Sequence, residues 1–280
     1  MRTIKLKKVL GVLVIILAAA VFTVGCSMNE TTELTGEATK GPIYGGTVTV
    51  YALNTDGSRG AEIASATTGA DGSYTVNLGE YTGAAAVVIT NGSYIDEATG
   101  TEVTLGAGDE FVTLLASTSD GMSVAVTALT TIAAANAVEN ASGGLAAAID
   151  AANLALATAF GIPDIDISGV IPADLTQSAA TATASAIAYG AVQSGLSQFA
   201  ETSGMPPSDV LDLIFDMALE FADGAFDGNY VDQTGYVPLL ETPVSTLTGL
   251  AAAIDAFLLS PEGADSGVVL SITVPPVVSP

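Results

Sequence analysis

The sequence predicts an α+β protein of several domains, in which an N-terminal antiparallel β-sandwich precedes a C-terminal all-α helical bundle. Residues 38–120 alternate short runs of β-branched residues with glycine-containing turns. Residues 124–260 instead place apolar residues at helical spacing. Hydrophobic residues make up 49% of the 280 residues, which is enough to build cores in both parts.

Residues 1–25 have the pattern of an export signal. Basic residues, among them Arg2 and Lys8, precede an apolar stretch that closes on small residues before Cys26. This stretch is shorter than the roughly 20 apolar residues that a membrane span needs. We therefore expect the signal to be cleaved rather than retained as an anchor helix.

Cys26 is the only cysteine, so it has no partner for an internal disulfide after export. The segment Val24-Gly25-Cys26 resembles the lipobox of bacterial lipoproteins, although Thr23 stands where that family usually has Leu. The resemblance implies that Cys26 is lipidated and holds the chain on a membrane, since several acyl chains anchor stably. In the Gram-negative lipoproteins that it resembles, Asp at the next position favours the inner membrane, so the resemblance implies that Ser27 directs the chain to the outer membrane or the cell surface. Residues 26–37 are then expected to form the lipidated tether.

The exported part is strongly acidic. The whole chain carries six basic and 30 acidic residues, and the signal contains four of the basic ones and none of the acidic ones. Only Lys40 and Arg59 remain positive after cleavage. Nucleic acid is excluded as a partner, because a binder must bring cations to the phosphates. The acidity fits either adaptation to salt or neutralisation by divalent cations, and both interpretations stay open.

Within residues 38–120, breaks such as Asp56-Gly57 and Asn91-Gly92 are the turn signals of antiparallel hairpins. The strands are expected at 47–51, 62–67, 74–78, 86–89 and 111–115.

Two segments of this region resemble the carboxypeptidase-regulatory-like domain of secreted bacterial proteins. They are KGPIYGGTVTVY, from Lys40, and ATTGADGSYTV, from Ala66. The chain departs from the family pattern at Gly46 and at Ala70-Asp71. The resemblance implies an immunoglobulin- or transthyretin-like sandwich without peptidase chemistry, serving as a spacer or a binding module.

The helical part opens with residues 126–133, which resemble the segment that follows such sandwiches in bacterial surface lipoproteins, with Ala128 in place of Pro. Breaks such as Gly161-Ile162-Pro163 separate the helices. They are expected at 127–139, 144–160, 174–202, 207–222 and 244–259. Residues 261–280 are expected to be a β-like tail that returns to an edge of the sandwich.

Two of these helices show distinct faces. The helix at 207–222 has an apolar face and, opposite it, an acidic face formed by Asp209, Asp212, Asp216 and Glu220. The helix at 174–202 has a small residue at every fourth position, which favours close approach of another helix. These residues are Ser178, Ala182, Ala186, Gly190 and Ser194.

Histidine is absent, which removes the usual general base and the commonest zinc ligand. Asp223, Asp227 and Asn229 surround two glycines, as a loop for calcium would, and resemble the D-G-x-x-D-G loop of the same lipoproteins. A solvated, glycine-capped helix end explains the loop equally well.

The acidic pairs Asp164/Asp166 and Asp96/Glu97 suit acid and base chemistry in principle, but abundant acidic residues favour solvated loop charges. Tyr81 and Tyr94 are expected at loop edges, where they could contact a ligand.

Together these patterns predict a lipid-anchored cell-envelope protein that is not an enzyme and has a structural or binding role. Its ligand would be a protein or a glycan of unknown identity. One alternative is a calcium-dependent adhesin or carbohydrate-binding module. The other is an envelope hydrolase that uses carboxylates, with Asp164, Asp166, Asp223 or Asp227 as its acids.

Overall fold

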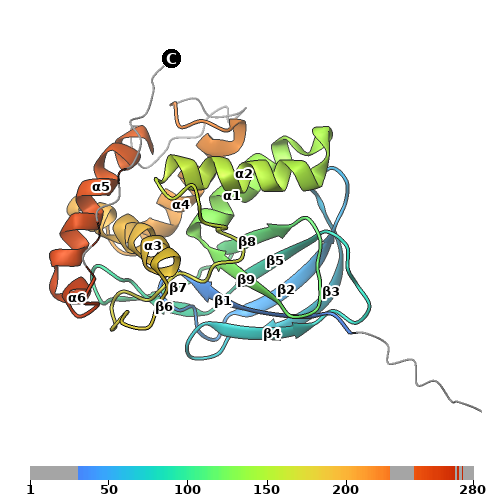
Figure 1. Cartoon of the computed structure of the whole chain (residues 1–280), viewed down its shortest axis with the longest axis horizontal. Helices are drawn as coiled ribbons and strands as arrows, with labels where there is room; N and C mark the ends of the chain where they lie inside the picture. Colours follow the sequence, from blue (N-terminus) through green and yellow to red (C-terminus); the bar gives the residue numbers. More distant parts are fainter. Residues whose placement is uncertain (1–30, 228–242, 269, 271–272, 274–280) are drawn as a thin grey trace, which may run out of the picture.

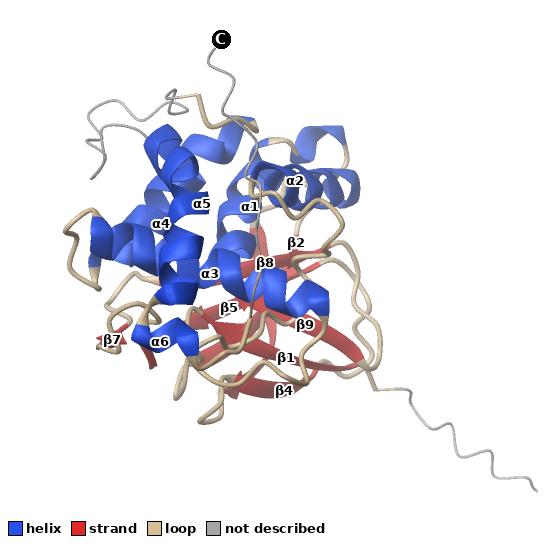
Figure 2. Ribbon diagram, turned by 60° about the vertical axis from the view of Figure 1, so that its left-hand side comes forward, coloured by secondary structure: helices blue, strands red, loops and turns tan. Residues whose placement is uncertain are grey.

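The structure is a computed structural model, which describes residues 31–227, 243–268, 270 and 273. It is an α+β protein in which the strands come first along the chain and the helices follow (Figure 1). Figure 2 shows the helices gathered on one side of the sheets. The expected fold class is confirmed at this level.

Nine strands occur among the described residues. Four of the five expected strands lie within one of them, and the fifth, 74–78, extends one residue beyond β4. Their bounds are β1 Glu33–Thr39, β2 Thr47–Leu53, β3 Arg59–Thr67, β4 Ser73–Asn77, β5 Ala85–Thr90, β6 Ser93–Ile95, β7 Glu102–Thr104, β8 Glu110–Leu115 and β9 Met122–Thr127.

The strands form three sheets, with the orders β4-β1-β9, β3-β2-β5-β8 and β6-β7. All neighbouring strands are antiparallel except β1 and β9, which run parallel. Burial follows this arrangement: β4 alternates buried and exposed residues, whereas the inner strand β5 is buried over nearly its whole length. The two larger sheets meet where the Thr113 hydroxyl of β8 donates to the Ala125 carbonyl of β9, at 2.6 Å.

The expected tether, residues 26–37, overlaps a strand, because β1 begins at Glu33 and lies in the middle of its sheet. Its small residues have a packing role. Gly36 leaves room for Tyr74, whose hydroxyl crosses β1 and donates to the Val124 carbonyl at 3.0 Å. A Cβ at Gly36 would lie 2.6 Å from the Tyr74 oxygen. Composition alone does not separate such a strand from a linker.

The helices follow β9. Their bounds are α1 Ala128–Glu139, η1 Ala141–Gly143, α2 Leu145–Ala159, α3 Ala184–Thr202, α4 Asp209–Glu220, η2 Phe221–Asp223, α5 Pro243–Leu259 and α6 Pro261–Ala264.

The start of the expected helical domain, near Val124, lies inside β9, so the chain passes from sheet to helix without a linker. Thr127 ends β9 and caps α1, where its hydroxyl and that of Thr130 form a capping box. Tyr189 of α3 reaches the same point, with its hydroxyl 2.6 Å from the Thr127 hydroxyl.

Helix α1 covers the outer edge of β8. The Val112 N–H donates to the Thr131 hydroxyl at 3.0 Å, so part of the edge of this sheet is satisfied by a helix rather than by another strand. One cluster of buried apolar side chains then runs from the strands into the helices; among its members are Val48, Phe111, Ile132, Leu196 and Ile254.

The helix expected at 174–202 begins only at Ala184, where Thr183 is the N-cap. Residues 174–183 are turns and loops. Asp174 explains part of this difference, because its carboxylate accepts from the Thr176 N–H and hydroxyl and so stabilises a turn.

The small residues of α3 do not all face another helix. Gly190 lies against the backbone of Ala173, in the segment that precedes the helix, and Ala173 N–H donates to the Ala186 carbonyl at 2.9 Å. A Cβ at Gly190 would lie 2.1 Å from the Ala173 oxygen. The expectation of close approach is correct here, but the approaching element is a loop.

The acidic face expected on α4 is only partly exposed. Asp216 and Glu220 are buried, at 2% and 0% exposure, and both have interaction partners. The helix therefore packs by more than the single apolar face that its sequence suggests.

Several expectations concern residues outside the described ranges. The signal peptide, Cys26 and half of the C-terminal tail are among them. The tail was expected to be β-like, but its first residues form the helix α6. Gly267, Val268, Leu270 and Thr273 are described, and none of the four is in a strand. No helix among the described residues combines the length and apolarity needed to cross a membrane.

Replacing Gly190 with Ala tests the contact between α3 and the preceding loop. We expect Gly190→Ala to lower the free energy of unfolding by about 2–3 kcal/mol, because the new methyl group overlaps a backbone oxygen that cannot move alone. Gly143→Ala is the control, since a Cβ there meets nothing within 4 Å. Equal denaturation midpoints for the two variants would contradict the close packing.

Candidate functional site

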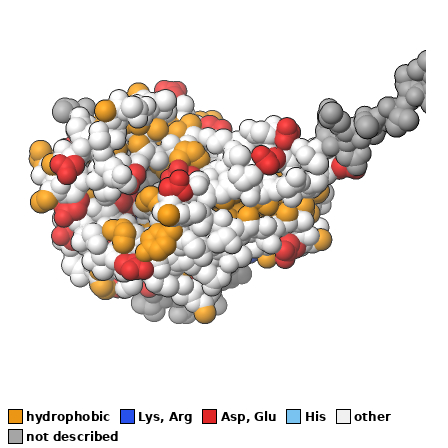
Figure 3. Space-filling view, turned by 90° about the horizontal axis from the view of Figure 1, so that it is seen from below, with side chains coloured by type: hydrophobic (Ala, Val, Ile, Leu, Met, Phe, Trp, Pro, Cys, Tyr) orange, Lys and Arg blue, Asp and Glu red, His pale blue; other side chains and the backbone are white. Residues whose placement is uncertain are grey.

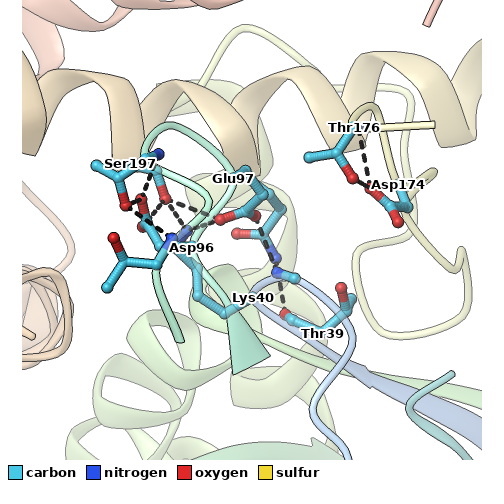
Figure 4. Close-up of polar contacts among 11 residues, drawn as sticks. Thr39, Lys40, Asp96, Glu97, Asp174, Thr176 and Ser197 are labelled. Atoms are coloured by element: carbon cyan, nitrogen blue, oxygen red, sulfur yellow. Dashed lines mark hydrogen bonds and ion pairs between the residues drawn. The ribbon is translucent and has the colours of Figure 1, made fainter. Parts of the chain in front are cut away.

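A buried polar cluster joins the sheets to α3, and Lys40 is at its centre. Lys40 follows β1 directly and is 0% exposed. Its Nζ lies 2.5 Å from Glu97 Oε2 and also donates to the hydroxyl of Ser197. Figure 4 shows the side chains of Lys40, Asp96, Glu97 and Ser197 pointing toward one another. The cluster brings together residues that are more than 150 positions apart in the chain.

The two carboxylates come from the connection between β6 and β7, and both are held by backbone groups. Glu97 Oε1 accepts from the Gly41 N–H at 3.0 Å. Asp96 Oδ1 accepts from the N–H and the hydroxyl of Thr99, at 3.0 and 2.9 Å. Asp96 and Glu97 are only 1% and 4% exposed. In each carboxylate, one oxygen therefore accepts from a backbone N–H, and the other lies within hydrogen-bonding distance of the Ser197 hydroxyl.

Ser197 projects from α3 between the charged groups. Its hydroxyl lies 2.6 Å from Asp96 Oδ2 and 2.8 Å from Glu97 Oε2. A serine hydroxyl has a single proton to donate, so it serves one of these carboxylates at a time.

The surroundings of the cluster are of low polarity. The ring of Tyr94 lies 5.9 Å from Lys40 Nζ, within the range of a cation–π interaction. Tyr94 is completely buried, and its hydroxyl has no hydrogen-bond partner among the described residues. Burial, followed by the charges of Glu97 and Asp96, raises the pKa of this phenol.

Two expectations from the sequence are corrected here. Asp96 and Glu97 are not solvated loop charges, because the connection that carries them is covered by α3. Tyr94 is a core residue rather than a ligand contact at a loop edge. Lys40 belongs to the motif that carries the family resemblance, and it and Arg59 are the only basic residues after residue 8, which could have drawn attention to it. Ser197 carries no such signal, since serines are common in this chain.

A small cleft of about 270 Å³ borders the cluster. Gly41, Tyr44, Ile95, Glu97 and Asp174 are among the residues that line it. Figure 4 shows Asp174 and its partner Thr176 beside the buried groups. The cleft therefore connects the region of Glu97 with the outside.

Glu37, on β1, lies near this region and is half-buried. Burial, together with the neighbouring charges of Asp71 and Asp174, raises its pKa from 4.5 to about 7. No cation is among the causes of this shift, so the negative charge of Glu37 is disfavoured in the folded state.

A larger groove of about 460 Å³ lies between β8 and α1. Most of its lining is apolar, and Val112, Ala135 and Phe215 contribute to it. Arg59 and Glu110 stand at the same groove and form a two-bond ion pair with each other. Each is about one-third exposed, so water screens this pair.

The expected calcium ligands are not shown as one site. The Asp223 carboxylate accepts from the Ala225 N–H at 3.0 Å, closing its own turn at Gly224, which has a φ of 97°. Asp227 is described and has a partner, whereas Asn229 lies outside the described residues. Within the described ranges, no three acidic, cysteine or histidine side chains are grouped to hold a metal.

Asp164 and Asp166, expected to be solvated loop charges rather than an acid–base pair, are exposed. Asp166 Oδ1 accepts from the N–H and the hydroxyl of Ser168, at 3.0 and 2.7 Å, which is the geometry of a turn. Tyr81 donates its hydroxyl to the Ala84 carbonyl and so supports a loop. Acidic and apolar side chains are scattered over the face in Figure 3, on which no Lys or Arg is seen.

Replacing each of the two cations tests the difference between a buried and an exposed ion pair. We expect Lys40→Met to lower the free energy of unfolding by about 3–5 kcal/mol, because it leaves two buried carboxyl groups without a cation. Arg59→Met should cost less than about 1 kcal/mol, since its partner Glu110 is partly solvated. Urea titrations of both variants measure the difference, and similar costs would show that the cluster is not a tight structural unit.

The raised pKa of Glu37 predicts a pH dependence of stability. Glu37 has a higher pKa in the folded protein than in the unfolded one. Its contribution to the free energy of unfolding is therefore complete below about pH 4.5 and is lost as the pH rises through about 7. Glu37→Gln should therefore match the wild type at the acid end and unfold at a higher temperature above pH 7. The difference between the two melting curves isolates Glu37 from the other carboxylates. Glu33→Gln, on the exposed side of the same strand, is the control, and a Glu37→Gln difference that does not vary with pH would contradict the assignment.

Comparison with known proteins adds no functional assignment. No family model matches this chain, and no curated protein or solved structure matches it either. The role of the cluster follows from its own geometry: a lysine, two carboxyl groups and a hydroxyl, all buried and bonded to one another.

Proposed function

We propose that this chain is a lipid-anchored cell-envelope protein with a non-catalytic, structural role, in which a rigid acidic body stands on a short lipidated segment. The observation that carries the structural role is the Lys40 cluster. Its charged groups are buried and bonded to one another, so they join three parts of the chain instead of facing a substrate.

The body in this proposal is a transthyretin-like β-sandwich combined with a helical bundle. Two sheets with the orders β4-β1-β9 and β3-β2-β5-β8 support the sandwich, as does the hydrogen bond between β8 and β9. The shared apolar cluster supports close packing of the helices on it. Because β1 begins at Glu33, only a few residues would separate the lipid from the folded body.

The surface charge bears on how the body would be held at a membrane. The part after the signal carries 30 acidic side chains and two basic ones, which repel anionic lipid head groups. Lipid attachment at Cys26 would then be what holds the body at a membrane that its surface charge avoids.

Membrane attachment through Cys26 is directly testable. We expect the full chain, expressed in a Gram-negative bacterium, to fractionate with membranes and to incorporate an alkyne-labelled fatty acid. Cys26→Ala should abolish the label and release the protein, because the acyl chains supply the anchoring energy. Ser27→Ala is the matched control and should keep the label. A Cys26→Ala protein that stays in the membrane fraction to the same extent would rule out this anchor.

A further inference from the structure

We propose that Lys40 and Glu97 form an intramolecular amide bond between Lys40 Nζ and Glu97 Cδ. The two side chains are buried, and Nζ lies 2.5 Å from Glu97 Oε2. They are separated by 57 positions in the chain, so the bond would close a long loop covalently. This inference goes beyond the proposed function and does not depend on lipid anchoring.

The first requirement for this reaction is an uncharged amine. The Ser197 hydroxyl accepts from Lys40 Nζ and lies 2.6 Å from Asp96 Oδ2, so a proton can pass from Nζ through the hydroxyl to Asp96. Transfer removes a buried positive and a buried negative charge together, which a site of low polarity favours. Asp96 acts as the base, and Ser197 relays the proton.

The second requirement is an electrophilic carbon with a stabilised oxygen. When Nζ adds to Cδ, the Gly41 N–H, 3.0 Å from Glu97 Oε1, faces the oxygen on which charge develops. Oε2 is the leaving oxygen, since it lies beside Ser197 at 2.8 Å, through which Asp96 can return its proton. The five groups therefore divide the roles of nucleophile, electrophile, oxyanion donor, relay and base.

The atoms balance without any further reactant. The ammonium group of Lys40 starts with three protons, and the Glu97 carboxylate starts with none. The Nζ–Cδ bond forms and the Cδ–Oε2 bond breaks; two protons leave with Oε2 as water, and one stays on the amide nitrogen. Positive and negative charges cancel, and Asp96 and Ser197 return to their initial protonation states.

The surroundings favour condensation over hydrolysis. Reacting groups held in one geometry can reach effective concentrations of about 10⁵–10⁸ M. The 270 Å³ cleft lined by Gly41 and Glu97 provides an exit for the released water. The chain has a single cysteine, so it cannot form an internal disulfide, and an amide would cross-link two distant parts of the chain in its place.

Trypsin digestion tests for the bond directly, because Lys40 and Arg59 are the only lysine and arginine after residue 8. The full chain is purified in detergent, unfolded and digested. An amide blocks cleavage after Lys40 and keeps the part ending at Arg59 attached to the part starting at Gly60. We expect these two parts to stay joined on a denaturing gel, with a mass lower by one water molecule and fragment ions that place the link on Glu97.

Three variants separate the reaction from simple stability. Lys40→Arg keeps the positive charge and the trypsin site but cannot form the amide, so it should give the separate fragments. Asp96→Asn and Ser197→Ala should slow linkage at least about tenfold in a pulse-chase experiment, since each removes a proton-transfer group. Ser203→Ala, at the exposed end of the same helix, is the control and should link at the wild-type rate.

Complete cleavage after Lys40 in the unfolded wild-type chain, with the full unmodified mass, would overturn the proposal. A link that maps to Asp96 would overturn the assignment of Glu97. Membrane fractionation of the same sample reports on lipid anchoring separately, so failure of one proposal is distinguishable from failure of the other.

Discussion

The burial of Lys40 is the constraint on which the rest of this structure depends. A buried ammonium group is tolerated only when it is paired and hydrogen-bonded. Glu97 provides the ion pair and Ser197 accepts a further hydrogen bond, while the Tyr94 ring covers the same group. The turn after β1, the connection between β6 and β7, and α3 must therefore assemble together. This requirement makes the sheets and the helices one cooperative unit.

Two further contacts support the same junction. Thr127 ends β9, caps α1 and meets the hydroxyl of Tyr189 on α3. Thr131 of α1 accepts from the Val112 N–H and covers the edge of β8. In each case a threonine hydroxyl accepts a hydrogen bond from a backbone N–H that would otherwise need water as its partner. The helices thus provide hydrogen-bond partners at the edge and end of the strands, and the chain passes from strand to helix without a linker.

The distribution of charge follows from how little positive charge the chain has. Of the two basic residues after residue 8, Lys40 is buried in the ion pair with Glu97, and Arg59 is paired with Glu110 at the edge of a groove. Several other carboxylates, such as those of Asp166 and Asp223, accept from backbone N–H groups or hydroxyls in their turns. Where such donors are missing, as at Glu37, burial and neighbouring acids raise the pKa instead.

Local patterns in the sequence determined the strand and helix types, because alternation and helical spacing depend on neighbouring residues; five strands and five helices were located this way. The same patterns misassigned residues 33–37 and 174–183, where packing of Gly36 and a turn at Asp174 decide the conformation. The candidate site was not predictable. Asp96, Glu97 and Ser197 meet Lys40 only when α3 covers the β6–β7 connection. Burial, which sets the chemistry of these groups, is a property of the tertiary structure, and no local pattern encodes it.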